Sequence, residues 1–386
     1  LELPELLHRV SISPTEGALA FQDLVATDAS QSPAAVDEQD TAMILYTSGT
    51  TGRPKGAMLA HCNLIHSAMV YEACLELTHK DRSIAAVPLA HVTGIAANIM
   101  SMARCAGALI IVPEFKAAEY LKIASRERAT QTVMVPAMYN LCLLQADFDS
   151  YDLSAWRIGG YGGAPMPVAT IQKLAEKLPG LKLVNAYGST ETSSPSTVMP
   201  PEFTASHGDS VGLPCPGAHI MVTSADGREL PRGEVGELWI HGGSVIKGYW
   251  NNPRATTESF TAGYWHSGDL GSIDEQNFVR VFDRQKDMIN RGGLKIYSAE
   301  VESVLAGHPA VIESAIVARP CPVLGERVHA VVVVRSEIDS PTLRSWCAER
   351  MSDYKVPETI SIGTEPLPRN ANGKVMKKNL RDSLTG

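Results

Sequence analysis

A loop rich in glycine and small hydroxyl side chains constrains the fold of this chain more than any other feature. It spans residues 46–56 and follows the apolar run at residues 42–45. A strand followed by such a loop is how a parallel sheet presents backbone N–H groups to a phosphate. The glycines allow close backbone approach, and Lys55 adds a mobile positive charge. A Walker-type loop is excluded because its lysine precedes Ser or Thr, whereas Lys55 precedes Gly56. The alternative is a polar turn between two elements.

The bulk composition is that of a globular protein with two or three domains. The chain has 386 residues, of which 44% are hydrophobic and 20% are charged, both ordinary values. Seven scattered cysteines without a C-x-x-C pair argue against a disulfide framework or a structural zinc site, and suit a cytoplasmic location. No apolar run approaches about 18 residues, so we expect no membrane span.

The charge is unevenly distributed along the chain. The net charge is −8, made up of −11 over residues 1–283 and +3 over residues 284–386. Nothing in this pattern resembles the broad basic surface of a nucleic-acid binder, so we expect no nucleic-acid partner. A modest basic bias is usually a solvated face, but it would also suit a segment that meets a polyphosphate.

Three textures follow one another along the sequence. Up to about residue 200, short β-branched runs alternate with helical patterns, which predicts a mainly parallel sheet covered by helices. Residues 211–282 read as short strands and Gly/Pro turns, which indicates a β-rich subdomain. The region after residue 283 reads as a small α+β domain. The expected strands are 109–112, 132–135, 181–184, 237–241, 315–317 and 330–334, and the expected helices are 118–128, 168–177 and 341–353.

Further short motifs occur in chain order and share one resemblance. Together with residues 46–56, they closely resemble the signature motifs of the acyl-adenylate-forming superfamily. That superfamily comprises the acyl- and aryl-CoA synthetases, the nonribosomal-peptide adenylation domains and the beetle luciferases. The matching segments are residues 88–94, 162–165, 185–191, 264–270, 283–289, 291–295 and 368–375.

The resemblance implies a nucleotide site assembled from residues spread along the chain. Tyr187 would stack on the adenine, and Asp269 would accept hydrogen bonds from both ribose hydroxyls, with Arg284 nearby. Thr190 would contact the α-phosphate, and Glu191 would hold Mg²⁺, a cation for which one carboxylate plus phosphate oxygens and waters suffices. The implied binding residues are Thr47, Ser48, Gly49, Thr50, Thr51, Lys55, Gly163, Ala164, Pro165, Ala186, Tyr187, Gly188, Asp269, Arg284 and Gly293; the implied catalytic residues are Lys374, Glu191, Thr190 and His91.

The resemblance also implies a mobile C-terminal lid. His91 would flank the substrate carboxylate, and Lys374 would bridge that carboxylate and the α-phosphate, because two anions must meet there. The lid would exclude water from the acyl-AMP. It would turn at Lys286 and bring the Gly293 loop to the pantetheine of CoA.

The implied fold class is α/β, with a large N-terminal part and a small α+β lid. The large adenylating domain would be residues 1–283, divided into an α/β part (1–205) and a β-rich part (206–283), and the lid would be residues 284–386. Family members usually carry about 100 or more further residues before the first motif, which implies an N-terminally shortened chain.

These features predict an ATP- and Mg²⁺-dependent ligase that joins a small carboxylic acid to CoA through an acyl-AMP. Ala186 stands where an arginine would suit a dicarboxylate, and no aspartate near His91 would pair with an amino acid's ammonium group. The glycines at 159–163 would leave room for a fatty or aromatic acid. The alternatives are a stand-alone adenylation enzyme that loads a carrier protein and a catalytically silent nucleotide-binding regulator. The oligomeric state stays open, with a homodimer as one option.

Overall fold

The computed structural model describes residues 10–13, 15–25, 32, 34–47, 54–164, 166–369 and 375–384. Its contacts divide the chain into two units, Leu1–Glu38 and Gln39–Gly386. In the first unit, β1 (Val10–Ser11) pairs in parallel with β2 (Leu19–Ala20), and α1 (Phe21–Leu24) follows. All the elements described below belong to the second unit.

The strand before the glycine-rich loop forms a hairpin. β3 (Thr41–Thr47) pairs antiparallel with β4 (Lys55–Ala60), and Thr47 lies opposite Lys55. The expected place of this strand in a parallel sheet was therefore wrong. The reason is that residues 57–60 are a second apolar run only a short loop away, and a short loop favours antiparallel pairing over a crossover.

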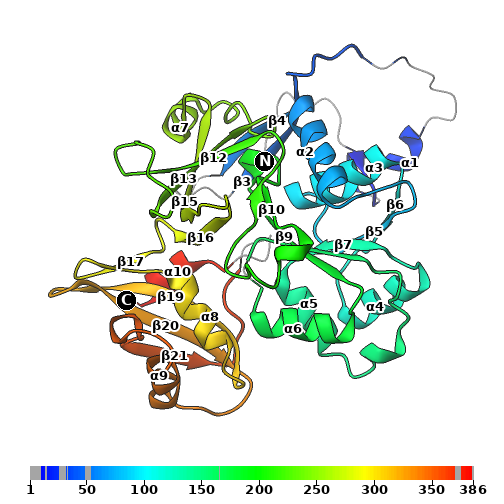
Figure 1. Ribbon diagram of the computed structural model, residues 1–386. Coiled ribbons are helices and arrows are strands. Elements are labelled where there is room, and N and C mark those ends of the chain that lie inside the picture. Colours follow the sequence, from blue (N-terminus) through cyan, green and yellow to red (C-terminus); the bar gives the residue numbers. More distant parts are fainter. Residues whose placement is uncertain are drawn as a thin grey trace. The chain divides into compact units, whose positions relative to one another are not determined.

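A seven-stranded sheet forms the centre of the α/β part (Figure 1). The strand order is β11-β10-β9-β8-β7-β5-β6, parallel from β9 to β6 and antiparallel at β10 and β11. The strands are β5 (Arg82–Ala85), β6 (Ala108–Ile111), β7 (Gln131–Met134), β8 (Ile158–Tyr161), β9 (Lys182–Tyr187), β10 (Thr197–Val198) and β11 (Leu213–Pro214). The expected mainly parallel sheet is confirmed.

Helices contribute to two hydrophobic cores against this sheet. One core includes side chains from α4 (Ala117–Arg126), α5 (Pro136–Leu143) and α6 (Val168–Lys177). The other includes α2 (His61–Cys74) and the π-helix η1 (Gly94–Met100), which continues into α3 (Ser101–Cys105). In Figure 1, α5 and α6 lie below the strands, and α2 and α3 lie above them.

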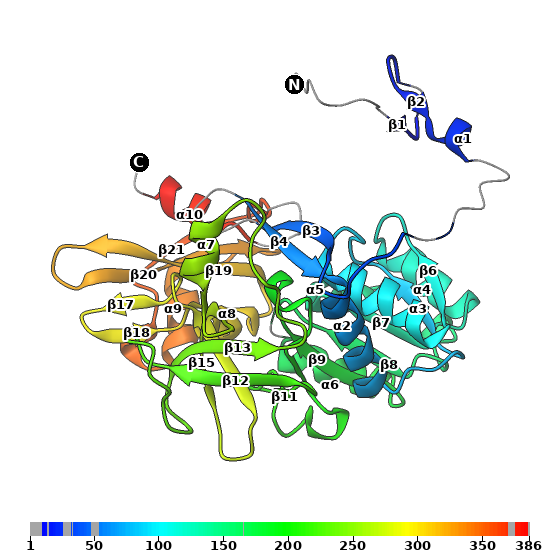
Figure 2. The same ribbon diagram turned by 90° about the horizontal axis from the view of Figure 1, so that it is seen from above.

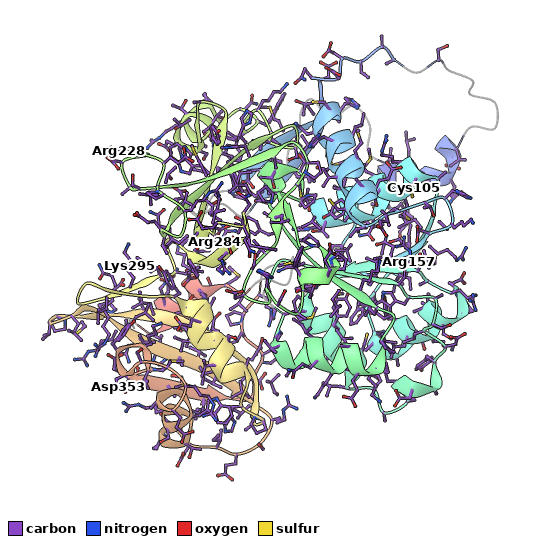
Figure 3. All side chains as sticks on the ribbon, viewed as in Figure 1. Cys105, Arg157, Arg228, Arg284, Lys295 and Asp353 are labelled. Carbon is purple, nitrogen blue, oxygen red and sulfur yellow. The ribbon has the colours of Figure 1, made fainter. Side chains whose placement is uncertain are left out.

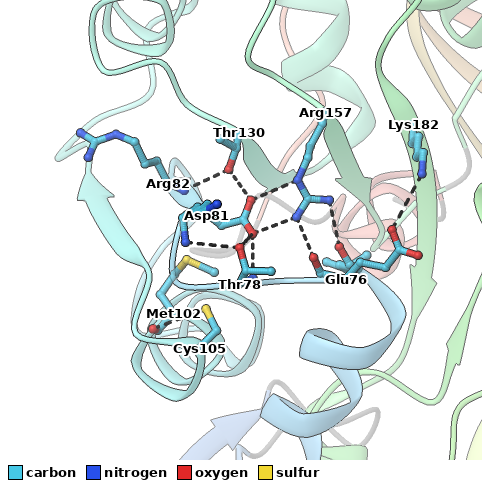
Figure 4. Close-up of polar contacts among 11 residues, drawn as sticks. Glu76, Thr78, Asp81, Arg82, Met102, Cys105, Thr130, Arg157 and Lys182 are labelled. Atoms are coloured by element: carbon cyan, nitrogen blue, oxygen red, sulfur yellow. Dashed lines mark hydrogen bonds and ion pairs between the residues drawn. The ribbon is translucent and has the colours of Figure 1, made fainter.

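A buried ion pair ties together the amino ends of three of the parallel strands (Figure 4). Asp81, 3% exposed, immediately precedes β5, while Thr130 and Arg157 precede β7 and β8. The Arg157 guanidinium donates to both Asp81 carboxylate oxygens at 3.1 and 2.9 Å, and the Thr130 hydroxyl donates at 2.6 Å. Burial pushes the pKa of Asp81 upward, but hydrogen bonds from Arg157 and Thr130 outweigh it and leave the pKa below its usual value.

Arg157→Met is expected to lower the free energy of unfolding by about 2–3 kcal/mol. This is less than the ~3–5 kcal/mol typical when a fully buried pair is broken, because Arg157 is partly exposed. The depressed pKa of Asp81 means that the pair stabilises the fold above the ordinary carboxyl pKa, and that this stabilisation is lost as the pH falls through the depressed value. The free energy of unfolding of the variant should therefore fall less steeply with acidification than that of the wild type.

Urea unfolding at neutral and acidic pH measures this effect. Arg254→Met is the matched control, since Arg254 pairs with Glu258 at 2.8 Å on an exposed helix surface, where an ion pair contributes little. Equal midpoints for the Arg157 variant and the control would refute the structural role of the buried pair.

The β-rich region forms a separate antiparallel sheet. Its order is β12-β13-β15-β14, with β16 paired to β15. The strands are β12 (Ala218–Thr223), β13 (Gly236–Gly242), β14 (Phe260–Thr261), β15 (Tyr264–Ile273) and β16 (Val279–Arg284). Asn252 caps the N-terminus of helix α7 (Pro253–Ser259), and its side chain accepts a hydrogen bond from the N–H of Ala255.

The C-terminal region is a further sheet with helices (Figure 2). Its order is β18-β17-β20-β19, and β21 pairs in parallel with β20. The strands are β17 (Ile289–Arg291), β18 (Leu294–Ile296), β19 (Val311–Cys321), β20 (Gly325–Val334) and β21 (Thr359–Gly363), and the helices are α8 (Ser298–Ala306), α9 (Ser340–Ala348) and α10 (Lys377–Ser383). These elements confirm the expected α/β fold class with a small α+β region.

Most differences from the expected elements are omissions. The sequence patterns did not predict helices α1, α2, α3, α5, α7, α8 and α10, and the helix expected at 341–353 ends at Ala348. A short 3₁₀ turn, Asp353–Lys355, occupies the rest. Helix α2 was missed because its exposed face carries the apolar side chains of Ile65 and Met69, while Asn63 and Ser67 lie on its buried face. Its apolar residues therefore show no clear helical period.

Candidate functional site

Two of the expected nucleotide segments follow the carboxyl ends of β8 and β9, adjacent parallel strands. Gly162 to Ala164 follow β8, and Gly188 to Glu191 follow β9. The two segments approach closely, because a Cβ atom on Gly162 would lie 2.3 Å from the carbonyl oxygen of Ala186. Gly163 has a φ of +77°, a conformation that favours glycine. Parallel sheets bind ligands at this edge.

Tyr187, Asp269 and Arg284 form one polar cluster. The Tyr187 hydroxyl donates to Asp269 Oδ2 at 2.6 Å, and the Arg284 guanidinium contacts Asp269 Oδ1 at 2.7 Å. Asp269 is 4% exposed, and it lies opposite Arg284 in the β15–β16 pairing. Figure 3 labels Arg284 on the ribbon. The structure therefore brings together three side chains that lie up to about a hundred positions apart in the sequence.

The charges in this cluster are fixed by their surroundings. Burial of the hydroxyl, followed by the charge of Asp269, raises the pKa of Tyr187 well above its usual value, so Tyr187 stays a hydrogen-bond donor. Burial by itself would lower the pKa of Arg284, but the negative groups around it, Asp269 foremost, together outweigh burial and raise that pKa, so Arg284 stays cationic. Since a carboxylate has about four lone-pair sites, Asp269 can accept further donors beside these two.

Glu191 forms a second cluster four residues after Tyr187. Its side chain lies in the 3₁₀ turn η3 (Thr190–Thr192) and is 7% exposed. The Ser189 hydroxyl donates to Oε2 at 2.6 Å, and the Tyr249 hydroxyl donates to Oε1 at 2.9 Å. The Lys55 ammonium lies 4.4 Å from the centre of the Tyr249 ring. Tyr249 therefore contacts both the Glu191 carboxylate and the Lys55 ammonium group.

This donor set fits Mg²⁺. Glu191 offers carboxylate oxygen, the ligand type that Mg²⁺ prefers, and the remaining ligands of this ion are usually substrate phosphate and water. Among the described residues, no group of three or more His, Cys, Asp and Glu side chains could hold a metal by themselves. A site of this kind would therefore depend on the nucleotide.

His91 lies in the turn between β5 and η1. Its Nδ1 accepts the backbone N–H of Thr93 at 3.2 Å and lies 3.1 Å from the Thr93 hydroxyl. Burial lowers the pKa of His91, which favours the neutral ring with its proton on Nε2. The turn requires Gly94, because a Cβ atom there would lie 2.3 Å from the carbonyl oxygen of Pro88.

The remaining expected residues fall into two groups. Thr47 is the last residue of β3, and Lys55, opposite it, is the first residue of β4. Gly293 lies in the β17–β18 turn with a φ of +93°, and its N–H donates to the side chain of Asn290. Outside the described residues lie Ser48, Gly49, Thr50, Thr51, Pro165 and Lys374.

Sequence reasoning missed Tyr249 and left Ser189 without a role. Ser189 stands two positions before Glu191 within an expected motif, so its contact could have been anticipated. The position of Tyr249 could not have been, because it depends on a contact across 58 positions of sequence. Its only local signal is an aromatic pair, Tyr249 and Trp250, directly after a glycine.

The glycines at 159–163 do not all open space for an acyl chain. A Cβ atom on Gly159 would lie 3.0 Å from Leu183, and one on Gly160 would lie 3.0 Å from Val133. These two glycines, like Gly162, permit close strand packing, and the expectation of room at these three positions was wrong. Gly163 is different, since its nearest neighbour would be the side chain of Val135 at 4.0 Å.

No helix in the described part of the chain combines the length and apolar character needed to cross a membrane. All seven cysteines are free thiols.

Two family models match the chain. The model of the AMP-binding enzymes matches residues 4–250, and the model of the AMP-binding enzyme C-terminal domain matches residues 300–374. A feruloyl-CoA synthase of Amycolatopsis sp. is 35% identical over 97% of this chain and 78% of its own length. The long-chain-fatty-acid–CoA ligase FadD13 of Mycobacterium tuberculosis is 33% identical over 96% and 73%.

Solved structures show the same fold. The O-succinylbenzoate coenzyme A synthetase of Bacillus subtilis, in complex with ATP and magnesium ion, matches with a TM-score of 0.84 and 32% identity, over 93% of this chain and 74% of that one.

The chain therefore belongs to the family of AMP-binding enzymes. Within it, the protein is an AMP-forming acyl-CoA synthetase, as its motifs implied. At the level of the family, this confirms ATP, Mg²⁺ and CoA as the cosubstrates and metal cofactor.

Proposed function

We propose that the protein activates a fatty or aromatic acid as an acyl-AMP and transfers the acyl group to CoA. This proposal rests on the placement of two buried carboxylates, those of Asp269 and Glu191, near the end of β9 and the turn that follows it. Asp269 is bonded to Tyr187, and Glu191 follows Tyr187 by four residues. One carboxylate suits the ribose end of a nucleotide, and the other suits a metal on its phosphates.

In the first step, the substrate carboxylate attacks the α-phosphorus of ATP and pyrophosphate leaves. Asp269 accepts hydrogen bonds from the ribose hydroxyls, and the neutral His91 ring lies beside the acid. Glu191 would hold Mg²⁺, which neutralises phosphate charge when bound. Lys374 would supply the cation between the attacking carboxylate and the α-phosphate.

In the second step, the CoA thiol attacks the acyl carbonyl and AMP leaves. We propose residues 1–283 as the adenylating domain and residues 284–386 as a lid that turns between the steps. Hydrogen bonds in the structure suit a pivot at Lys286. The Gln285 N–H donates to the carbonyl of Gly268 in β15 at 2.8 Å, so Gln285 is held to the β-rich sheet. The Asp287 N–H instead donates to the carbonyl of Arg284 at 2.9 Å, within the local turn.

The proposed substrate class rests on two uncharged positions near Tyr187 and β8. Ala186 places no charge beside Tyr187, and Gly163 faces the side chain of Val135. An acid with an apolar body fits these residues better than a dicarboxylate or an amino acid. The names of the relatives, a feruloyl-CoA synthase and a long-chain-fatty-acid ligase, support both the aromatic and the fatty option.

ATP–pyrophosphate exchange with a panel of acids tests the first step, and thioester formation with CoA or a carrier protein tests the second. We expect exchange with fatty or aromatic acids and transfer to CoA. Transfer only to a carrier protein would favour the stand-alone adenylation enzyme. No exchange with any acid would favour a catalytically silent regulator.

A cytoplasmic location stays a prediction from the sequence.

Asp269→Asn is expected to weaken ATP binding by about 10- to 100-fold, with the KM for the acid unchanged. A hydrogen bond to a charged group contributes about 1.5–3 kcal/mol, and each ~1.4 kcal/mol is a factor of about ten. Titration calorimetry with ATP measures the loss.

Asp274→Asn is the matched control for this prediction. Asp274 also lies beside the β-rich sheet and is bonded to an arginine, Arg280, at 2.7 Å, but we place it outside the site. Equal ATP affinity in the two variants would return Asp269 to a purely structural role.

A further inference from the structure

Tyr249 touches two charged groups of the site at once. It lies between β13 and α7 and is 3% exposed. Its hydroxyl donates to Glu191 Oε1 at 2.9 Å, and its ring face lies 4.4 Å from the ammonium nitrogen of Lys55. The two charged residues come from different elements, the turn after β9 and the start of β4.

Backbone hydrogen bonds hold the segment that carries Tyr249 to both of these elements. Trp250 N–H donates to the carbonyl of Gly56 at 2.7 Å, and Met58 N–H donates to Gly248 at 3.1 Å. Ile246 N–H donates to the carbonyl of Glu191 at 2.9 Å. The Tyr249 N–H also bonds the Thr256 hydroxyl at 3.0 Å. A side chain anchored in this way has little freedom to follow its partners, so it can fix their positions.

We propose that Tyr249 is a positioning residue that aims the Glu191 carboxylate at Mg²⁺ with its hydroxyl and holds the Lys55 ammonium near the phosphates with its ring. This inference rests on the proposed function, in which Glu191 holds the metal. Ser189 and Tyr249 each donate to one oxygen of Glu191. The carboxylate is thereby fixed in orientation, as hydrogen-bond donors to metal ligands generally fix them.

The ring suits Lys55 for a different reason. A ring face attracts a cation without accepting directed hydrogen bonds from it. The three N–H donors of the ammonium group therefore stay available to phosphate oxygens. A carboxylate in the place of the ring would compete with the nucleotide for these donors.

Two substitutions separate the two contacts. Tyr249→Phe removes the hydroxyl and keeps a ring for Lys55, whereas Tyr249→Leu removes both. ATP affinity is measured by titration calorimetry in Mg²⁺ and again in EDTA. Tyr249→Phe should weaken ATP binding by about tenfold in Mg²⁺, as the loss of a hydrogen bond to a metal ligand typically does, and leave binding in EDTA unchanged. Tyr249→Leu should also weaken binding in EDTA, by about threefold.

Controls distinguish positioning from stability. Tyr120→Phe removes the hydroxyl of another buried tyrosine, which lies in α4, and it should leave both affinities at the wild-type level. In a Glu191→Gln background, adding Tyr249→Phe should cause no further loss in Mg²⁺, because its effect acts through Glu191. The half-saturating Mg²⁺ concentration for adenylation should rise about tenfold in Tyr249→Phe.

Each failure points to a different error. Equal losses in Mg²⁺ and EDTA for Tyr249→Phe, wild-type affinity in both, or a variant that no longer folds would overturn the role of Tyr249. If Glu191→Gln keeps the full Mg²⁺ enhancement of ATP binding, the proposed metal ligand itself is wrong. Loss of that enhancement in Glu191→Gln but not in Tyr249→Phe would reject the positioning role and leave the proposed function intact.

Discussion

Replacing Lys374 with alanine is expected to slow adenylation by about 100-fold or more, because the variant lacks the cation that we propose to bridge the attacking carboxylate and the α-phosphate. Removal of one preorganised group that stabilises transition-state charge typically costs this much. Thioester formation from preformed acyl-AMP should change far less, since the proposed lid would present another face in that step. Single-turnover measurement of each half-reaction tests both statements.

Lys378→Ala is the matched control for the lysine experiment. Lys378 is an exposed lysine of α10, four positions further along the chain, and its loss should leave both half-reactions unchanged. If Lys374→Ala slows the two half-reactions equally, the division of labour between two lid orientations does not hold.

Lys286→Pro is expected to preserve one half-reaction and strongly impair the other. Proline fixes φ near roughly −65° and also restricts the residue before it. The three flanking N–H donors, those of Gln285, Asp287 and Met288, are kept. The substitution should therefore limit rotation at the proposed pivot without removing these bonds. Stopped-flow measurement of adenylation and thioester formation distinguishes the two steps.

Lys286→Ala is the control for the loss of the side chain alone. Burial lowers the pKa of Lys286, so this lysine is not a freely solvated charge, and alanine tests whether its charge matters. We expect near wild-type rates in both steps for alanine, and unchanged ATP binding for proline. Wild-type rates for the proline variant in both steps would place the pivot elsewhere.

The contacts around the proposed pivot also indicate which interactions a rotation of the proposed lid would break. The Asp283 carboxylate on β16 accepts hydrogen bonds from the N–H and the hydroxyl of Ser298 in α8. The rings of Phe282 and Tyr297 stack at 5.3 Å. Burial raises the pKa of Asp283 despite the nearby charge of Lys377. The described arrangement is therefore held by specific contacts across the proposed boundary.

Local patterns identified three strands of the seven-stranded sheet and misplaced a strand of the separate β3–β4 hairpin. Short β-branched runs predicted β6, β7 and β9, because a parallel strand buried on both faces reads as a continuous apolar run. The same reasoning placed β3 in a parallel sheet, and the structure pairs it with β4 instead. The pairing partner of a strand depends on which segments lie next to each other in the folded chain, and the apolar run alone does not specify that partner.

The sequence by itself determined the family, the fold class and the order of the motifs, because these depend on residues that are adjacent in the chain. Glycine turns, the Gly-Asp pair at Asp269 and the late lysine at Lys374 are such local signals. Only the tertiary structure decided that Tyr187 and Arg284 share the Asp269 carboxylate, and that Tyr249 joins Glu191 to Lys55. It also decided that the glycines of β8 serve strand packing. Hydrogen bonds and packing act over a few ångströms in space, and that proximity is set by the whole fold rather than by any local pattern.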